Sequence, residues 1–163
     1  MYDTSVTGIA RKRRQPEPTA PLALRDFLCF AVYATGHAFN HVYQPLLKEL
    51  NLTYSQFIAM VVLWDQDGQT VGELGRKLFL QSNTLTPMLK RLETLGYIRR
   101  ARDAADERQV CISLTEAGRK LQSRASDIVR NVRNATGVQD RKMKQLLRDL
   151  SALRQALESH TSD

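Results

Sequence analysis

The residue in this chain best suited to covalent chemistry is Cys29, which lies in an apolar and aromatic segment, LCFAVYATGHAFNHVY, at residues 28–43. A cysteine thiolate is a nucleophile that oxidants convert to sulfenic acid. A cysteine among apolar neighbours is, however, most often a small core residue that does no chemistry. The segment alone leaves both interpretations open, and the rest of the chain has to decide between them.

Charge and composition limit the kinds of partner. The 163 residues carry 24 Lys and Arg against 17 Asp and Glu, a formal net charge of +7, which favours an anionic partner such as nucleic acid or a membrane surface. No run of about 18 apolar residues could span a bilayer, and no apolar signal segment follows the N-terminal charges. We therefore expect a cytoplasmic protein with no membrane partner, in which Cys29 and Cys111 are thiols.

The chain divides by pattern into four stretches, residues 1–20, 21–52, 53–114 and 115–163. Residues 1–20 hold RKRR but no periodic apolar positions, which predicts a disordered basic tail, either merely solvated or a non-specific phosphate contact. Residues 21–52 carry apolar positions at helical spacing, and Pro45 predicts a bend or restart of that helix. Residues 115–163 predict two more helices, separated by a break at Gly137.

Residues 53–96 predict helices with clear ends. Thr53 and Thr70 suit N-caps, and Gly68 and Gly96 suit helix stops. The segment VGELGRKLFL, a turn at 80–82 and SNTLTPMLKRLETLGYI together form a helix-turn-helix.

The second helix of this motif has two contrasting faces. One is an apolar stripe, made of Leu85, Met88, Leu89, Leu92 and Leu95. The other can approach base edges and phosphates with small polar residues and cations. Its members are Ser82, Asn83, Thr84, Thr86, Pro87, Lys90 and Arg91.

Residues 97–114 change to a period of two, which predicts a β-hairpin wing with strands at 97–102 and 109–114 around the loop DAADER. Arg99, Arg100, Arg102 and Arg108 place cations along this wing, and an arginine at a hairpin tip suits a narrow minor groove. Asp106 is placed to orient Arg108 through a charge-assisted hydrogen bond. Alone, the loop would be a solvated turn; directly after a helix-turn-helix it favours DNA binding.

The apolar stripes of the last two helices exceed what one small winged domain can cover, so we expect them to pair with the first helix across a two-fold axis. A homodimer would suit a pseudo-palindromic operator in double-stranded DNA. The predicted fold class is mainly α with a small β-hairpin wing: a dimerisation helix (21–52), a winged helix-turn-helix DNA-binding region (53–114) and C-terminal dimerisation helices (115–163).

The order of these elements, with LTPMLKRLETLGYIRR followed by DERQVCISLTEAG, resembles the MarR family of bacterial transcriptional regulators over roughly residues 22–157. LCFAVY, NLTYSQF and TLTPMLKRLE resemble its organic-hydroperoxide-sensing branch, the OhrR-type repressors. The resemblance implies that Cys29 is the redox-sensing thiol, that Tyr43 and Tyr54 hydrogen-bond to it, and that oxidation by an organic hydroperoxide releases the operator.

Helix geometry constrains these roles. Cys29 and Tyr43 would stand about 21 Å apart along a straight helix, so a contact requires a strong bend or a tyrosine from the partner subunit, as the family resemblance implies. A helix that starts near residue 22 places Cys29 too deep for help from the N-terminal dipole. Arg25, one turn earlier, is then a candidate cation for stabilising the thiolate.

Several alternatives stay open at this stage. No cysteine follows Cys111, which favours capping of oxidised Cys29 by a small cellular thiol, with pairing to Cys111 as the alternative. His37 and His41 are spaced for a metal but lack a third ligand, so no metal and no cofactor is expected. The sequence predicts a repressor and not an enzyme. One competing function is a regulator that answers to a small aromatic ligand in an interhelical pocket at the same site, with Cys29 incidental, and another is a thiol peroxidase. Operator placement decides between repression and activation.

Overall fold

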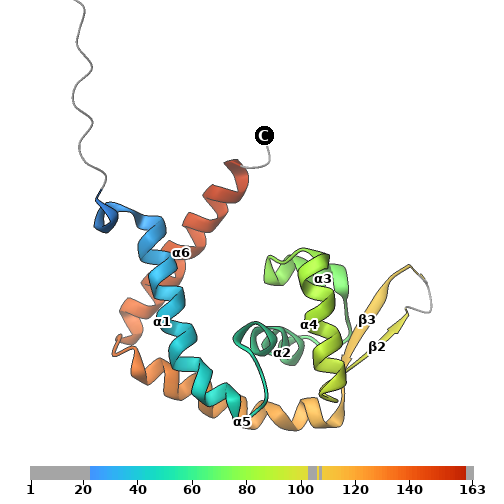
Figure 1. The fold of residues 1–163 in the computed structure, drawn as a ribbon. Helices are drawn as coiled ribbons and strands as arrows, with labels where there is room; N and C mark the ends of the chain where they lie inside the picture. The colour runs from blue at the N-terminus through green and yellow to red at the C-terminus, as the bar shows by residue number, and fades with distance from the viewer. Residues whose placement is uncertain (1–22, 103–105, 107, 161–163) are drawn as a thin grey trace, which may run out of the picture. The chain divides into compact units, whose positions relative to one another are not determined.

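The computed structural model describes residues 23–102, 106 and 108–160. The predicted tail at 1–20 and most of the loop DAADER lie outside the described residues. The elements follow one another along the chain as a 3-10 helix at Leu24–Asp26, α1 at Leu28–Lys48, α2 at Tyr54–Asp65, β1 at Gln69–Thr70, α3 at Val71–Leu78, α4 at Ser82–Thr94, β2 at Ile98–Arg102, β3 at Val110–Leu114, α5 at Glu116–Ala135 and α6 at Asp140–His160 (Figure 1). By backbone contacts the chain forms two units, Met1–Gly36 and His37–Asp163.

The start of α1 corrects one prediction. The backbone N–H groups of Asp26 and Phe27 bond to carbonyls three residues back, which makes a single 3-10 turn. Phe27 then takes an extended conformation (φ −92°, ψ 111°), so the α-helix begins only at Leu28. Cys29 is therefore the second residue of α1 and not a residue deep inside a helix.

Pro45 does not end the first helix. It lies inside α1, which continues to Lys48, so the predicted restart at this proline is wrong. The helix still ends close by, and Leu47 and Leu50 are buried in the core of the second unit.

Two capping boxes fix the helices that lead into the DNA-binding region. The Thr53 side chain accepts a hydrogen bond from the Gln56 backbone, and the Gln56 side chain accepts one from the Thr53 backbone (3.3 and 2.8 Å). Thr70 and Glu73 repeat the arrangement at the start of α3 (3.2 and 2.8 Å). Such caps satisfy backbone donors that a helix start leaves unpaired. Both predicted N-caps are confirmed.

The ends of the other helices also agree with the sequence patterns, with one exception. Gly96 and Gly137 take left-handed conformations (φ 76° and 62°) directly after α4 and α5. The exception is α3, which stops at Leu78, two residues before the end of the predicted segment. Phe79 there takes a left-handed conformation (φ 55°) that terminates the helix.

The wing is a small antiparallel sheet with the strand order β1-β3-β2. Strands β2 and β3 start within one residue of their predicted bounds, and Arg100 pairs with Ile112 in the middle of the ladder. The sequence analysis missed β1, whose two residues are too short to show a period of two. Gln69 and Thr70 extend the sheet by pairing with Ile112 and Cys111.

The core of the second unit lies between α2, α3, α4, α5 and the sheet. Three leucines of the predicted α4 stripe are fully buried, and Met88 and Leu95 are partly buried against them. Helix α2 is apolar on nearly every side but is not buried all round, because the Val61 side chain is 38 % exposed. Positions Ile112 and Leu114 of β3 face the core, as their alternation predicts.

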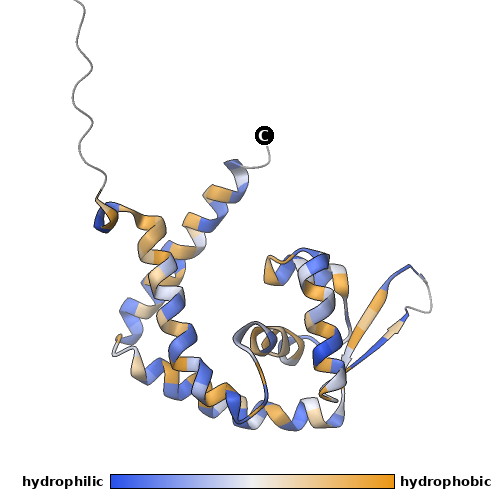
Figure 2. Ribbon diagram, viewed as in Figure 1, coloured by the Kyte–Doolittle hydropathy of each residue, from blue (hydrophilic) through white to orange (hydrophobic). Residues whose placement is uncertain are grey.

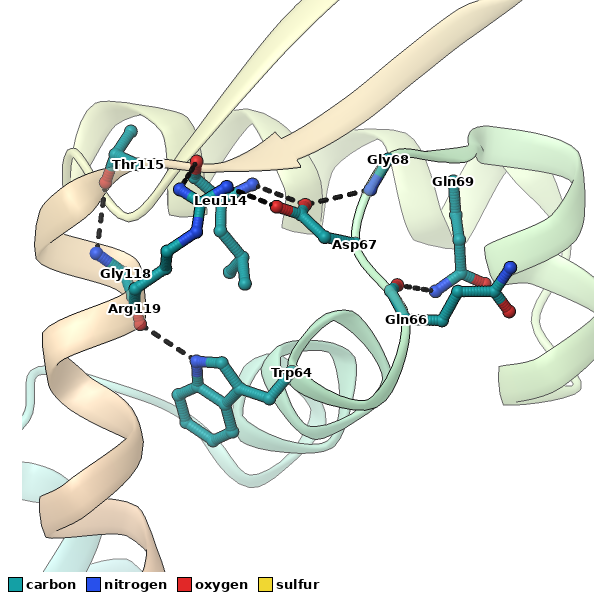
Figure 3. A network of polar contacts seen from close by, with 9 residues as sticks. All are labelled: Trp64, Gln66, Asp67, Gly68, Gln69, Leu114, Thr115, Gly118 and Arg119. Atoms are coloured by element: carbon teal, nitrogen blue, oxygen red, sulfur yellow. Dashed lines mark hydrogen bonds and ion pairs between the residues drawn. The ribbon is translucent and has the colours of Figure 1, made fainter.

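A polar network joins the α2–β1 loop to the junction of β3 and α5 (Figure 3). The Asp67 carboxylate accepts hydrogen bonds from the backbone N–H of Leu114 (2.8 Å) and from the Arg119 guanidinium (2.5 Å). The Trp64 indole donates to the Gly118 carbonyl (2.8 Å). These bonds fix the base of the wing to the first turn of α5, whose N-cap, Thr115, accepts a hydrogen bond from the Gly118 N–H.

Helices α1 and α6 carry hydrophobic residues along their length (Figure 2), and several of these side chains are exposed to solvent. On α6, Leu147, Leu150 and Leu157 are 59 %, 49 % and 61 % exposed. On α1, Phe30, Val32, Phe39 and Val42 are exposed as well. Within the described residues, no helix is both long and apolar enough to cross a membrane.

Candidate DNA interface and thiol site

The outer face of α4 is arranged as the sequence predicts. Thr86 is half-buried, and the other residues predicted for DNA contact lie in solvent, namely Ser82, Asn83, Thr84, Pro87, Lys90 and Arg91. The buried stripe of the same helix fixes this face outward. A row of short polar side chains followed by cations can reach base edges and phosphates of a duplex.

The wing loop gives Asp106 a clear structural role. One carboxylate oxygen accepts a hydrogen bond from the Arg108 backbone N–H (3.0 Å), and the other accepts one from the Gln109 side chain (3.0 Å). Asp106 thus fixes the backbone at Arg108, and Arg99 and Arg108 are both exposed on the wing. The predicted support of Arg108 by Asp106 stays a prediction as far as the guanidinium is concerned.

A cleft of about 510 Å³ separates α4 from the wing. It is lined by Thr70 of β1, by Val71, Gly72, Glu73 and Arg76 of α3, by Ser82 and Thr86 of α4, and by Arg100, Arg108, Gln109 and Val110 of the hairpin. The sequence analysis named Arg100 only as one of the wing cations and did not single out Arg76. Alternation along β2 places Arg100 on the same face as buried Ile98.

Two tyrosines assigned by the family resemblance lie together in the second unit. The rings of Tyr43, on α1, and Tyr54, on α2, have centroids 4.9 Å apart, and Phe57 packs on Tyr43 at 5.6 Å. Burial raises the pKa of both hydroxyls above the ordinary tyrosine value, and the proximity of Tyr54 raises that of Tyr43 further. Both phenols therefore keep their protons at physiological pH and act as O–H donors.

The first unit contains the candidate thiol. Cys29 is a free, exposed cysteine in the first turn of α1. Arg25 belongs to the preceding 3-10 helix and not to α1, so the predicted spacing of one turn on a common helix is wrong. Its guanidinium lies 3.8 Å from the Asp26 carboxylate, and both side chains are exposed.

The other titratable candidates take different places. Cys111 is partly buried in β3, paired with Thr70 on one side and Ala101 on the other. His37 and His41 line a cavity of about 570 Å³ together with Tyr54 and Arg91. Among the residues that the structure describes, no group of three or more His, Cys, Asp or Glu side chains could hold a metal ion.

Known proteins resemble this chain over most of its length. Residues 41–125 match the family described as "Transcriptional regulator SarA/Rot". The HTH-type transcriptional regulator TtmR of Methylorubrum extorquens is 47 % identical over 137 residues, which are 84 % of this chain and 70 % of TtmR. The organic hydroperoxide resistance transcriptional regulator of Bacillus subtilis is 42 % identical over 136 residues, 83 % of this chain and 92 % of that protein.

Solved structures of transcriptional regulators also resemble this chain. Reduced AbfR bound to DNA is 35 % identical, with a TM-score of 0.68 over 80 % of this chain and 91 % of that chain. A disulfide form of AbfR is 36 % identical, with a TM-score of 0.60 over 77 % and 88 %. The relatives are transcriptional regulators, and the fold and the α4 face support DNA binding. This chain belongs to the MarR/SarA-type family of winged helix-turn-helix transcriptional regulators, in the branch of the organic-hydroperoxide resistance (OhrR-type) regulators.

Proposed function

We propose that this DNA-binding regulator is a repressor that senses organic hydroperoxides through Cys29 and leaves a pseudo-palindromic operator when Cys29 is oxidised. The observation that carries the proposal is the Tyr43–Tyr54 pair, whose rings lie 4.9 Å apart. These are the two positions that the family resemblance assigns to hydrogen-bonding the thiol. Burial keeps both hydroxyls protonated, so both can donate to a sulfur anion.

The position of Cys29 in α1 supports the same role. Unpaired N–H groups in the first turn of a helix carry partial positive charge, which stabilises a thiolate over a thiol. No acidic residue lies in that first turn of α1. Phe27 and Phe30 flank the cysteine and are partly exposed, so they offer apolar contact to the organic group of a hydroperoxide. The helix start thus supplies the stabilisation that the sequence analysis sought from Arg25.

The reaction uses only the thiolate and the peroxide. The sulfur attacks the terminal oxygen of the hydroperoxide, a sulfur–oxygen bond forms and the oxygen–oxygen bond breaks. The leaving alkoxide takes up a proton and departs as an alcohol, while Cys29 becomes a sulfenic acid. Sulfur loses two electrons and the peroxide gains them. A small cellular thiol, or Cys111, then forms a disulfide with the oxidised sulfur and releases water.

A homodimer brings the parts of this site together. Fourteen residues separate Cys29 from Tyr43 on α1, a rise of about 21 Å on a straight helix. The proposal therefore gives each thiol a tyrosine from the partner subunit. The exposed apolar faces of α1 and α6 supply a surface on which a second copy can pack. The dimer acts in the cytoplasm on double-stranded DNA.

Release of DNA follows from loss of the hydrogen bonds to the sulfur anion. An oxidised sulfur is no longer the anion that accepts from the tyrosine hydroxyls, and Tyr54 lies at the first turn of α2. Helix α2 packs against α3, α4 and α5. Movement of α2 is therefore expected to change the spacing between the two α4 helices of a dimer, which must match one turn of the duplex.

The rates of Cys29 oxidation and of DNA release, measured together, test this proposal. We expect one equivalent of cumene hydroperoxide per subunit to add one oxygen atom to Cys29, measured by intact mass, and to release a fluorescent operator duplex at the same rate. The operator is selected from a random pool by the reduced protein. Continuous peroxide consumption with reductant would indicate a thiol peroxidase instead, and release before any mass change would contradict redox sensing.

Removal of one phenol should slow the reaction without changing the fold. We expect Tyr54→Phe to lower the rate of Cys29 oxidation about tenfold or more, because a hydrogen bond to a charged group is worth roughly 1.5–3 kcal/mol. The rate is measured by quenched-flow mass spectrometry. Tyr97→Phe is the matched control, since its hydroxyl donates to the Leu50 carbonyl (3.1 Å). Equal rates of Cys29 oxidation in Tyr54→Phe and Tyr97→Phe would show that Tyr54 does not stabilise the thiolate.

A second candidate is supported by the cavity of about 570 Å³ beside α1 and α2, whose size suits a small-molecule ligand. In that case an aromatic effector would release DNA, and Cys29 would be incidental. Treatment with a thiol reductant separates the two functions. It restores DNA binding after oxidation of Cys29 but does not reverse release by a bound ligand.

A further inference from the structure

We propose that Arg76 and Arg100 form a clamp for one backbone phosphate of DNA in the cleft between α3, α4 and the wing. The clamp rests on the DNA-binding part of the proposed function and is independent of Cys29. It would assign the affinity contributed by this cleft to Arg76, which the sequence analysis did not single out, and to Arg100, which it named only as one cation of the wing.

The location of the cleft explains why a phosphate should enter it. A recognition helix in the major groove and a wing in the adjacent minor groove lie on either side of one sugar–phosphate strand. In this chain the space between α4 and the wing is the cleft lined by Ser82, Thr86, Arg100 and Arg108. The strand that separates the two grooves must therefore pass along this cleft.

Arg100 has unused hydrogen-bonding capacity that points to an anion. Its side chain is only 19 % exposed, and its Nε is buried without a hydrogen-bond partner among the described residues. The Glu93 carboxylate stands 3.9 Å from Nη1, beyond hydrogen-bond distance. Glu93 instead accepts a hydrogen bond from the Arg100 backbone N–H (3.0 Å). Glu93 thus holds the strand in place and leaves guanidinium donors for a ligand.

Arg76 reaches the same cleft from α3. An alanine Cβ built at Gly72 would lie 3.9 Å from Arg76 Nη1, so the guanidinium folds back over the first turn of α3. A planar guanidinium matches the oxygens of a phosphate with two parallel hydrogen bonds.

The charge of the cleft also selects an anion. Three arginines line it against one glutamate, Glu73. The Glu73 carboxylate accepts hydrogen bonds from the Thr70 backbone and hydroxyl (2.8 and 2.9 Å), which hold the pKa of the Glu73 carboxyl below its usual value. Glu73 is therefore committed to the α3 cap, and the arginines keep a net positive field for a ligand oxygen.

The test compares the salt dependence of DNA binding in matched variants. Dissociation constants for a random-sequence duplex are measured by fluorescence anisotropy at increasing KCl for the reduced parent, Arg76→Gln and Arg130→Gln. Each lost phosphate contact lowers the slope of log affinity against log salt by about 1, so we expect that loss per bound subunit for Arg76→Gln. Arg130 pairs with Asp127 on α5 and is exposed, so Arg130→Gln should keep the parental slope.

Arg100→Lys provides a second variant that preserves charge but lacks the guanidinium fork and Nε. It should bind the duplex more weakly than the parent at every salt concentration while melting at a similar temperature. Equal slopes for Arg76→Gln and Arg130→Gln would overturn the clamp. A second outcome would also overturn the clamp. If calorimetry shows tight binding of inorganic phosphate that Arg76→Gln abolishes, and the DNA slope is unchanged in this variant, the cleft serves a free anion. Failure of the parent to bind any duplex would instead refute DNA binding itself.

Discussion

Replacement of Gly118 by alanine is expected to lower the free energy of unfolding by about 3 kcal/mol or more, the upper range for overpacking a buried site. Gly118 is buried in the first turn of α5, and an added Cβ would overlap the carbonyl oxygen of Tyr97. Backbone atoms form this contact, so no change of side-chain rotamer can relieve it. The turn or the start of β2 has to move.

Movement at this position would break several hydrogen bonds at once. The Gly118 carbonyl accepts from the Trp64 indole and its N–H donates to the Thr115 hydroxyl (2.8 and 3.0 Å). Thr115 in turn donates through its backbone N–H to Tyr97 and through its hydroxyl to Gly96 (3.0 and 2.6 Å). These hydrogen bonds connect the wing to α5, so the substitution should also weaken DNA binding.

Urea unfolding followed by circular dichroism measures the effect. Gly36→Ala is the matched control, because a Cβ there meets nothing within 4 Å and alanine favours helix. We expect Gly36→Ala to be neutral or slightly stabilising in the reduced protein. A Gly118→Ala protein as stable as the parent would show that α5 and β2 are not packed as described.

The helix caps and the buried stripe could be predicted because local chemistry determines them. Thr53, Thr70 and Thr115 each offer a hydroxyl to a backbone N–H three residues later, a signal that needs no tertiary information. The leucine stripe of α4 and the alternation in β3 follow from the periods of helix and strand. These features were sufficient to predict a winged helix-turn-helix.

The start of α1 could not be predicted, because no local capping signal marks it. Apolar residues continue at helical spacing through Leu24 and Phe27, and no Ser, Thr, Asp or Asn stands immediately before Leu28. Periodicity therefore does not show that Phe27 is extended, and the first turn containing Cys29 was placed too deep in a helix. In the structure Cys29 lies in the first turn of α1, the part of a helix that most favours an anion.

The cleft and the tyrosine pair show a different limit. Arg100 and Arg76 are far apart in sequence and line the same cleft only because the sheet packs against α3 and α4, so no local pattern marks them as partners. Tyr43 and Tyr54 were assigned by family resemblance, and the structure places their rings together. The same resemblance assigns Cys29 as their partner, and the proposed contact joins side chains of two subunits.

Substitution of Cys29 by serine is expected to abolish the response to hydroperoxide and leave DNA binding intact. Serine has nearly the same size, and Cys29 is exposed, so folding should be unaffected. A serine hydroxyl remains protonated at neutral pH and does not attack peroxide as a thiolate does. The variant should therefore remain a permanently bound form of the regulator.

Operator affinity before and after oxidation tests the central claim most directly. Reduced, cumene hydroperoxide-treated and re-reduced samples of the parent, Cys29→Ser and Cys111→Ser are titrated against the selected duplex. We expect treatment to weaken binding by the parent about 10- to 100-fold, the range of typical allosteric coupling, with full recovery on re-reduction and no change for Cys29→Ser. Loss of DNA by treated Cys29→Ser as readily as by the parent would contradict sensing through Cys29.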